Sequence, residues 1–168
     1  NPRWARRLLI VVGILLLTVI IRDTTQHYSV EYLYLGLLLV FFIAAAFLVA
    51  NEVLLTGSVD LNKVVGAVAL YLLIGLIWSI FYTIILEIWP DALRGIEAGP
   101  WYDNMARTTY FSFVTLTTLG YGDISPARPM AEVLVILEAV VGMFYLAVIV
   151  ASLVGGLMRN IPEKPPTA

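Results

Sequence analysis

The sequence predicts an all-α membrane protein with four transmembrane helices, plus a shorter re-entrant helix and loop between the third and the fourth. Of the 168 residues, 61% are hydrophobic and 13% are charged, whereas soluble domains have roughly 45–50% and about 25%. The apolar residues form long continuous runs, as a helix that crosses a bilayer requires. One Gly-Tyr-Gly stretch, at residues 120–122, interrupts this pattern.

Four apolar segments account for the transmembrane helices, at Leu8–Ile21, Tyr32–Ala50, Val64–Leu86 and Ala131–Met158. A spanning helix needs about 20 residues, so the last three segments are long enough. The first has 14 residues and crosses only if Trp4 and the long stems of Arg6 and Arg7 extend it. A signal peptide is the alternative for this segment, although no small-residue cleavage site follows it.

Positive charge near the first segment predicts the orientation. Arg3, Arg6 and Arg7 precede it, and basic residues favour the cytoplasmic side. The N-terminus is therefore expected in the cytoplasm, and four crossings return the C-terminal tail to that side. Neither Leu8–Ile21 nor Tyr32–Ala50 contains an arginine, so we expect no voltage sensor of the arginine-ladder type.

The scarcity of reactive side chains argues against an enzyme. The chain has no cysteine and one histidine, His27, so neither a thiol nucleophile nor a histidine-based metal site or triad is expected. The net charge of −2 gives no footprint for nucleic acid. We therefore predict no catalytic residues, no bound cofactor and no nucleic-acid partner.

The stretch before residue 120 predicts a helix that is too short to cross the membrane. Asp103 or Asn104 is a suitable N-cap, and Met105–Thr117 then continues helically for about 20 Å. Because the fourth segment must descend to the cytoplasm, this helix has to enter and leave on the outer side. Irregular backbone at membrane depth occurs only inside protein or along a water-filled path. Thr117–Asp123 is therefore expected to line such a path, with glycines that permit unusual backbone angles.

The sequence TTLGYGD, at residues 117–123, resembles the selectivity filter of potassium channels, in which four strands supply rings of carbonyl oxygens. The resemblance covers about Val64–Arg159 and is similar to small prokaryotic channels with an extra helical hairpin before a two-helix pore unit. It implies a homotetramer in which K⁺ is the permeant ion. The implied K⁺-coordinating residues are Thr118, Leu119, Gly120 and Tyr121, with Gly122 completing the outer mouth.

The same resemblance implies which residues support the filter. Asp123 lies behind its outer end, and Tyr110 and Phe111 form an aromatic cuff. Many members of the family have tryptophan in this cuff and glutamate at the position of Val114, and this sequence has neither. How Asp123 is held is therefore open at this stage.

The fourth segment carries the remaining candidate residues. The resemblance places Met143, Leu146 and Val150 on the pore cavity and makes Gly142 a gating hinge, with close packing against a neighbouring helix as the alternative.

Glu138 shares the helix stripe of Gly142, Tyr145 and Ile149, about 100° from the cavity face. It should face the hydroxyls of Ser112, Thr115 and Thr117 and brace the filter in its protonated form. A polar contact between helices without a role in gating is the alternative.

The expected organisation is an N-terminal hairpin and inner loop at 1–63, a pore domain at 64–159 and a cytoplasmic tail at 160–168. The expected function is passive, potassium-selective conduction in a tetramer embedded in membrane lipid, in the plasma membrane of a prokaryote. Two alternatives remain from the sequence. One is a less selective channel for monovalent cations on the same scaffold, and the other is a non-conducting membrane scaffold or transporter subunit.

Overall fold

The computed structural model describes Gly13, residues 28–55 and residues 61–159. Its elements are α2 (Tyr28–Leu55), α3 (Leu61–Ile88), β1 (Leu93–Arg94), α4 (Trp101–Leu116), β2 (Ser125–Pro126) and α5 (Pro129–Arg159). Apart from Gly13, the first apolar segment lies outside the described residues, as do His27 and the tail at 160–168. The proposed crossing at Leu8–Ile21 therefore stays a prediction.

Three of the described helices are long and apolar enough to cross a membrane. These candidate spans are Glu31–Val53, Lys63–Ile88 and Pro129–Ile149. They correspond to the second, third and fourth predicted segments, and each helix extends a few residues beyond the apolar run at both ends. An all-α membrane fold is therefore confirmed.

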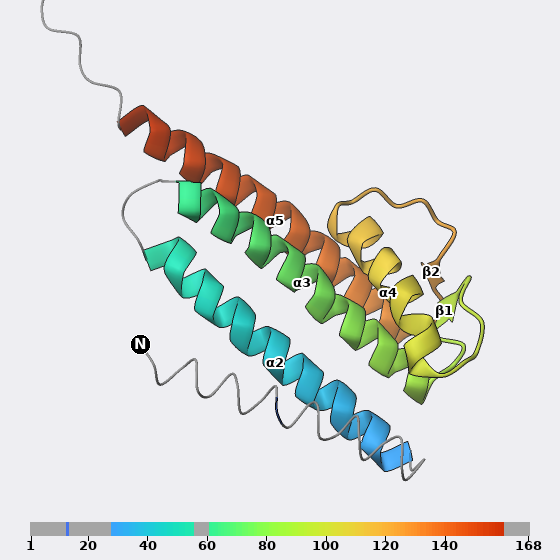
Figure 1. Ribbon diagram of the computed structural model, residues 1–168. Coiled ribbons are helices and arrows are strands. Elements are labelled where there is room, and N and C mark those ends of the chain that lie inside the picture. The colour runs from blue at the N-terminus through green and yellow to red at the C-terminus, as the bar shows by residue number, and fades with distance from the viewer. Residues whose placement is uncertain (1–12, 14–27, 56–60, 160–168) are drawn as a thin grey trace, which may run out of the picture.

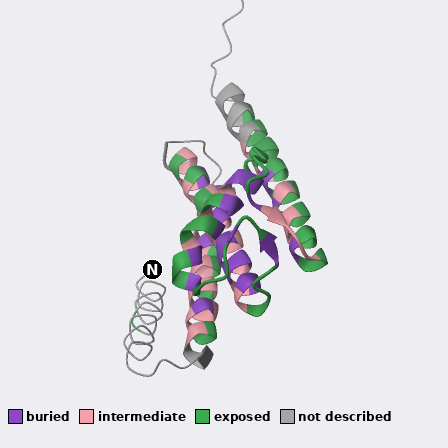
Figure 2. Cartoon of the chain, turned by 90° about the vertical axis from the view of Figure 1, so that its right-hand side faces the viewer, coloured by how far each residue is buried: buried purple, intermediate pink, exposed green. Residues whose placement is uncertain are grey.

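Helix α3 is the centre of the arrangement. It lies between α2 and α5, and the shorter α4 packs beside the ends of α3 and α5 that are far from the C-terminal tail (Figure 1). Tyr82 and Phe111 join α3 to α4, with their rings edge to face at 4.9 Å, and Trp78 packs against the same apolar cluster. Helix α4 is thus held by α3, and its C-terminal residues Val114, Thr115 and Leu116 are buried, whereas the chain becomes exposed directly after the helix (Figure 2).

The start of α4 differs from the prediction. The helix begins at Trp101, four residues before the predicted Met105, and Pro100 occupies the N-cap position without a side-chain cap. Proline fits there because its φ is already near the helical value and no backbone N–H is lost. The side-chain amide of Asn104 donates instead to the Gly99 carbonyl, at 3.0 Å. The prediction that Asp103 or Asn104 caps this helix was wrong.

The loop between α3 and α4 pairs with the chain that follows the re-entrant loop. Strands β1 and β2 are antiparallel, with Leu93 opposite Pro126 and Arg94 opposite Ser125. Leu93 and Ile124 are buried in the same apolar cluster as Tyr82 and Phe111. The outer loop is therefore part of the core that positions residues 117–123.

Candidate functional site

Residues 117–123 form an irregular strand that turns back along the end of α4. The N–H of Thr118 donates to the Thr115 carbonyl at 2.9 Å. The N–H groups of Leu119 and Gly120 both donate to the Val114 carbonyl, at 2.9 and 3.3 Å. Outside the regular elements of the described chain, no backbone hydrogen bond ends on a carbonyl of residues 118–122. The N–H groups of residues 118–120 therefore face the helix, and the carbonyl oxygens of residues 118–122 have no backbone donor in the described chain.

The backbone angles explain why glycine occurs twice in this strand. Gly120 and Gly122 have φ values of +60° and +78°, in the left-handed region that side chains disfavour. Thr118 also has a positive φ, of +58°, which costs of order 1–3 kcal/mol for a non-glycine residue. The sequence indicated the two glycines but not this strained threonine. Strain of this kind persists when the surrounding contacts fix the backbone.

The strand is exposed in the single chain. Residues 117–123 are all exposed, and Tyr121 and Leu119 retain 67% and 55% of their accessible surface. These two side chains are left uncovered by the rest of the described chain. One copy of the strand therefore supplies one wall of a site and leaves its flank uncovered.

The outer loop clamps the exit of the strand. Gly95 has a φ of +86°, and a Cβ atom at this position would overlap the carbonyl oxygen of Asp123. The guanidinium of Arg107, from α4, donates to the Gly95 carbonyl at 3.1 Å. Nearby, Arg128 holds the Asp91 carboxylate through two hydrogen bonds, at 2.8 and 2.9 Å. We refer to Gly95, Arg107, Asp91 and Arg128 as the outer clamp.

The two residues of the predicted aromatic cuff lie in different surroundings. The phenol of Tyr110 interacts with the Asp123 carboxylate, so Asp123 has a partner on α4. Phe111 is buried, with its ring against Tyr82. In the described structure, only Tyr110 of this pair has a recorded contact with Asp123.

Glu138 is fully buried where three helices meet. The Tyr82 hydroxyl, from α3, donates to Glu138 Oε2 at 2.6 Å. The Ser112 hydroxyl, from α4, lies 2.5 Å from Glu138 Oε1 and 2.7 Å from the Gly75 carbonyl oxygen of α3. The predicted orientation of Glu138 toward Ser112 therefore matches the structure. Tyr82 and Gly75 were missed, because a tyrosine and a glycine in an apolar helix carry no signal of their partner.

Thr115 and Thr117 were also predicted to face Glu138, but the described structure shows no hydrogen bond between either hydroxyl and the carboxyl group. The Thr117 hydroxyl donates to the Phe113 carbonyl at 2.6 Å. Thr115 is buried, but no recorded hydrogen bond links it to Glu138. Ser112 is thus the hydroxyl of α4 that holds the carboxyl group.

A ladder of hydroxyl contacts joins α3 to α4 beyond Ser112. Ser79 and Thr109 are 2.8 Å apart between their hydroxyl oxygens, and Thr83 and Thr108 are 2.7 Å apart. On α3 these contacts step by four residues, from Gly75 to Ser79 and Thr83, whereas on α4 they fall at Ser112, Thr109 and Thr108. This interface is polar although both helices lie in an apolar protein.

Gly142 lies where α5 crosses the end of α4. A Cβ atom at Gly142 would overlap the Leu116 carbonyl oxygen, and the Tyr71 hydroxyl donates to that same oxygen at 3.3 Å. Helix α5 is continuous through this point. Close packing thus accounts for the glycine, and a role as a hinge stays a prediction.

The predicted cavity residues lie on the open side of α5. Met143 and Leu146 retain 58% and 46% of their accessible surface, whereas Tyr145 donates its hydroxyl to the Ala67 carbonyl of α3. The side chain of Val150 is outside the described part. The face of α5 that carries Met143 and Leu146 is thus directed away from its own α3.

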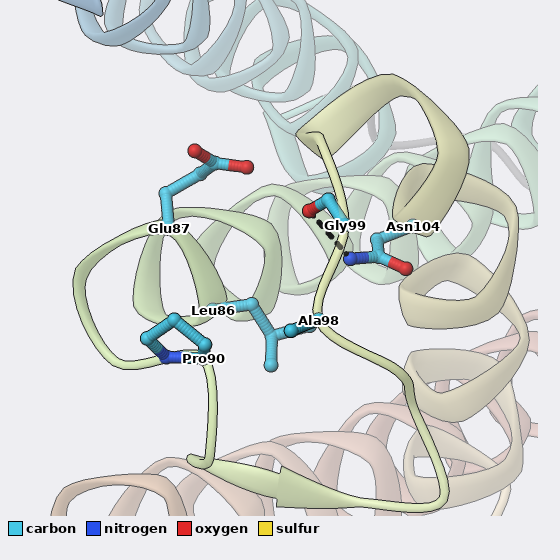
Figure 3. A pocket seen from close by; sticks show the side chains of 6 residues that line it. All are labelled: Leu86, Glu87, Pro90, Ala98, Gly99 and Asn104. Atoms are coloured by element: carbon cyan, nitrogen blue, oxygen red, sulfur yellow. Dashed lines mark hydrogen bonds between the residues drawn. The ribbon is translucent and has the colours of Figure 1, made fainter.

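A small hollow of about 70 Å³ lies at the C-terminal end of α3. Figure 3 shows the Asn104 amide pointing at the Gly99 carbonyl across the hollow from Leu86 and Pro90, while the Glu87 carboxylate points away. The hydrogen bond ties the start of α4 to the preceding loop. We assign this hollow a structural role only.

A family model described as "Ion channel" matches residues 66–159. The chain belongs to this ion channel family. The matched range begins in α3 and ends with α5, so it contains α4 and the strand at 117–123.

Curated relatives of this channel chain include potassium channels. It is 39% identical over 58 residues to two pore potassium channel c of Oryza sativa, covering 34% of this chain and 12% of the relative. It is 35% identical over 81 residues to the inward rectifier potassium channel Kirbac3.1 of Paramagnetospirillum magnetotacticum, covering 42% and 28%. It is 33% identical over 64 residues to two-pore potassium channel 5 of Arabidopsis thaliana, covering 38% and 15%.

The chain spans less than a third of the length of these relatives. No solved structure matches it. The family and the apolar helices establish an integral membrane protein of the ion channel family.

Proposed function

We propose that this chain forms a homotetrameric, potassium-selective channel for passive conduction. The strand at 118–122 carries the proposal, because the N–H groups of Thr118, Leu119 and Gly120 donate to α4 while no backbone donor is recorded in the described chain for the carbonyl oxygens of the strand. Four such strands around one axis would replace the hydration shell of K⁺ with carbonyl oxygens. In this proposal Thr118, Leu119, Gly120 and Tyr121 coordinate the ion, and Gly122 completes the outer mouth.

The exposed surfaces support a tetramer. Tyr121 and Leu119 are exposed beside the strand, and Phe144 of α5 retains 67% of its surface. Neighbouring copies would cover these side chains, while Met143, Leu146 and Val150 would line the cavity below the filter. With the basic N-terminal residues on the inner side, both termini are cytoplasmic in this arrangement.

The test is the reversal potential of the purified protein in planar bilayers under opposed K⁺ and Na⁺ gradients. We expect it to follow the K⁺ gradient, and Tyr121→Asp to reduce selectivity for K⁺ over Na⁺. Tyr102→Asp is the matched control, because it adds the same charge to an exposed tyrosine of α4 away from the strand. Equal Na⁺ permeability in the unmodified protein would favour the less selective cation channel.

The size of the conducting species tests the assembly. A monomer or dimer that conducts would contradict the tetramer, because one or two strands cannot enclose an ion. A stable tetramer without any current would favour a scaffold or transporter subunit. Size measurement in lipid nanodiscs, together with the bilayer recording, separates these outcomes.

A further inference from the structure

The hydrogen-bond partners of Glu138 determine where its proton lies. The Ser112 hydroxyl has one hydrogen but lies 2.7 Å from the Gly75 carbonyl and 2.5 Å from Glu138 Oε1. A backbone carbonyl only accepts, so the Ser112 hydrogen satisfies Gly75. The short contact to Glu138 Oε1 then needs a hydrogen from the carboxyl group itself. Tyr82 supplies the hydrogen for Oε2.

The surroundings of Glu138 contain no charge that would balance a carboxylate. The groups that act on it are the hydroxyls of Ser112 and Tyr82, and the titratable groups of α3 that it affects are the phenols of Tyr71 and Tyr82. No cation from α3, α4 or its own helix α5 is among the recorded partners of this fully buried side chain. An unpaired buried charge is costly.

The contact between Glu138 and Ser112 is connected to the proposed filter through α4. Ser112 lies one half-turn before Val114, whose carbonyl accepts the N–H groups of Leu119 and Gly120. The contacts that hold Ser112 against α3 and α5 therefore also fix the position of the Val114 carbonyl, which accepts the hydrogen bonds of the filter strand. No other acidic side chain is buried in the described part of the pore unit.

We propose that Glu138 is a positioning residue that works as a neutral carboxylic acid, bridging α3, α4 and α5 so that α4 presents Val114 to the filter. Ionisation removes the hydrogen that Ser112 accepts, so the Ser112 hydroxyl can serve either Gly75 or Glu138 but not both. The bridge then opens and a charge is left in the core. This inference rests on the proposed function and adds that conduction declines when pH is raised far enough to ionise Glu138.

Two substitutions test whether Glu138 works as a neutral carboxylic acid or as a carboxylate. Glu138→Gln reproduces the neutral pattern, because the amide oxygen accepts from Tyr82 and the amide N–H donates to Ser112. We expect open probability and selectivity within about twofold of the unmodified channel, without the alkaline decline. Glu138→Val leaves the Tyr82 phenol without its acceptor, and we expect open probability to fall about tenfold or more.

Glu132→Gln is the matched control, since Glu132 is on the same helix but exposed. This variant should keep the alkaline decline. Tyr82→Phe removes one donor while leaving the Ser112 contact, so it should shift the decline without abolishing it. If Glu138→Gln is as damaging as Glu138→Val, the working form is the carboxylate and the proposal is wrong.

Two measurements do not depend on conduction. Infrared difference spectra between the unmodified protein and Glu138→Gln, in lipid at neutral pH, should contain the band of one protonated carboxyl group. Thermal unfolding of the tetramer should show the same order of variants and the same alkaline sensitivity. Absence of the band overturns the proposal. A band and stability pattern without K⁺ current overturns the proposed function and leaves this inference standing.

Discussion

Gly95, in the loop between α3 and α4, lies directly against the backbone carbonyl of Asp123, at the end of the proposed filter strand. The contact is possible because Gly95 has no Cβ atom and adopts a φ of +86°. We expect Gly95→Ala to displace residues 122–124, because the left-handed angle costs an alanine roughly 1–2 kcal/mol and the methyl group overlaps Asp123. K⁺ over Na⁺ selectivity should fall in bilayer recordings.

Gly99→Ala is the control for this prediction. Gly99 is in the same loop, but a Cβ atom there would meet its nearest neighbour at 3.9 Å. If both variants keep full selectivity, the loop does not hold the filter exit.

The crossing of α5 over the end of α4 can be tested at two glycines of one helix. Gly142→Ala should lower the melting temperature of the tetramer, because its methyl group overlaps the Leu116 carbonyl. Gly155→Ala meets nothing within 4 Å, so it should be neutral or raise stability by up to about 1 kcal/mol through helix propensity. If Gly142→Ala leaves stability unchanged and alters only gating, Gly142 acts as a hinge.

The ion pair between Arg128 and Asp91 is exposed, and we expect it to matter little for global stability. The hydrogen bonds from Arg128 hold the pKa of Asp91 below its ordinary value of 3.8. A lowered carboxyl pKa contributes stability above the ordinary value, and this contribution is lost as pH falls through the lowered one. Acid sensitivity from this pair is therefore confined to pH below about 4.

Thermal unfolding of Asp91→Asn and of the unmodified tetramer should diverge near neutral pH and converge in strong acid. A difference that persists unchanged in strong acid would show that Asp91 acts through something other than this pair. Arg128→Lys should resemble Asp91→Asn, because lysine cannot form the two parallel hydrogen bonds.

We expect weak voltage dependence because the first two apolar segments contain no arginine. Voltage sensing of the ladder type moves several charges per subunit across the membrane. We therefore expect a shallow dependence of open probability on voltage, measured over a wide range in symmetric K⁺. A steep sigmoidal curve would contradict this expectation, whereas mild rectification from ion block would not.

Much of the fold could be predicted because its signals are periodic or compositional. Hydropathy alone located α2, α3 and α5, since the bilayer requires long apolar runs. The 100° step of a helix, together with the cavity face that the family resemblance implied, placed Glu138 toward Ser112. The glycines at 120 and 122 indicated irregular backbone, and both have positive φ.

The parts that could not be predicted depend on contacts between segments far apart in the sequence. Gly95 lies in a loop without sequence periodicity, so the sequence does not predict its contact with Asp123. Tyr82 is one of many aromatic residues in α3, and its partner is known only from the fold. The start of α4 was misplaced because Asp103 and Asn104 are good caps, while Pro100 supplied the geometry instead.

The hydroxyl ladder between α3 and α4 has a consequence for register. Its contact points lie four residues apart on α3, at Gly75, Ser79 and Thr83, but are unevenly spaced on α4, at Ser112, Thr109 and Thr108. Sliding α4 by one turn, about 5.4 Å, would not restore this set of contacts, and it would move Ser112 away from both Gly75 and Glu138. The uneven row of hydroxyl groups therefore specifies one register of α4, and with it the depth of the residues that follow this helix.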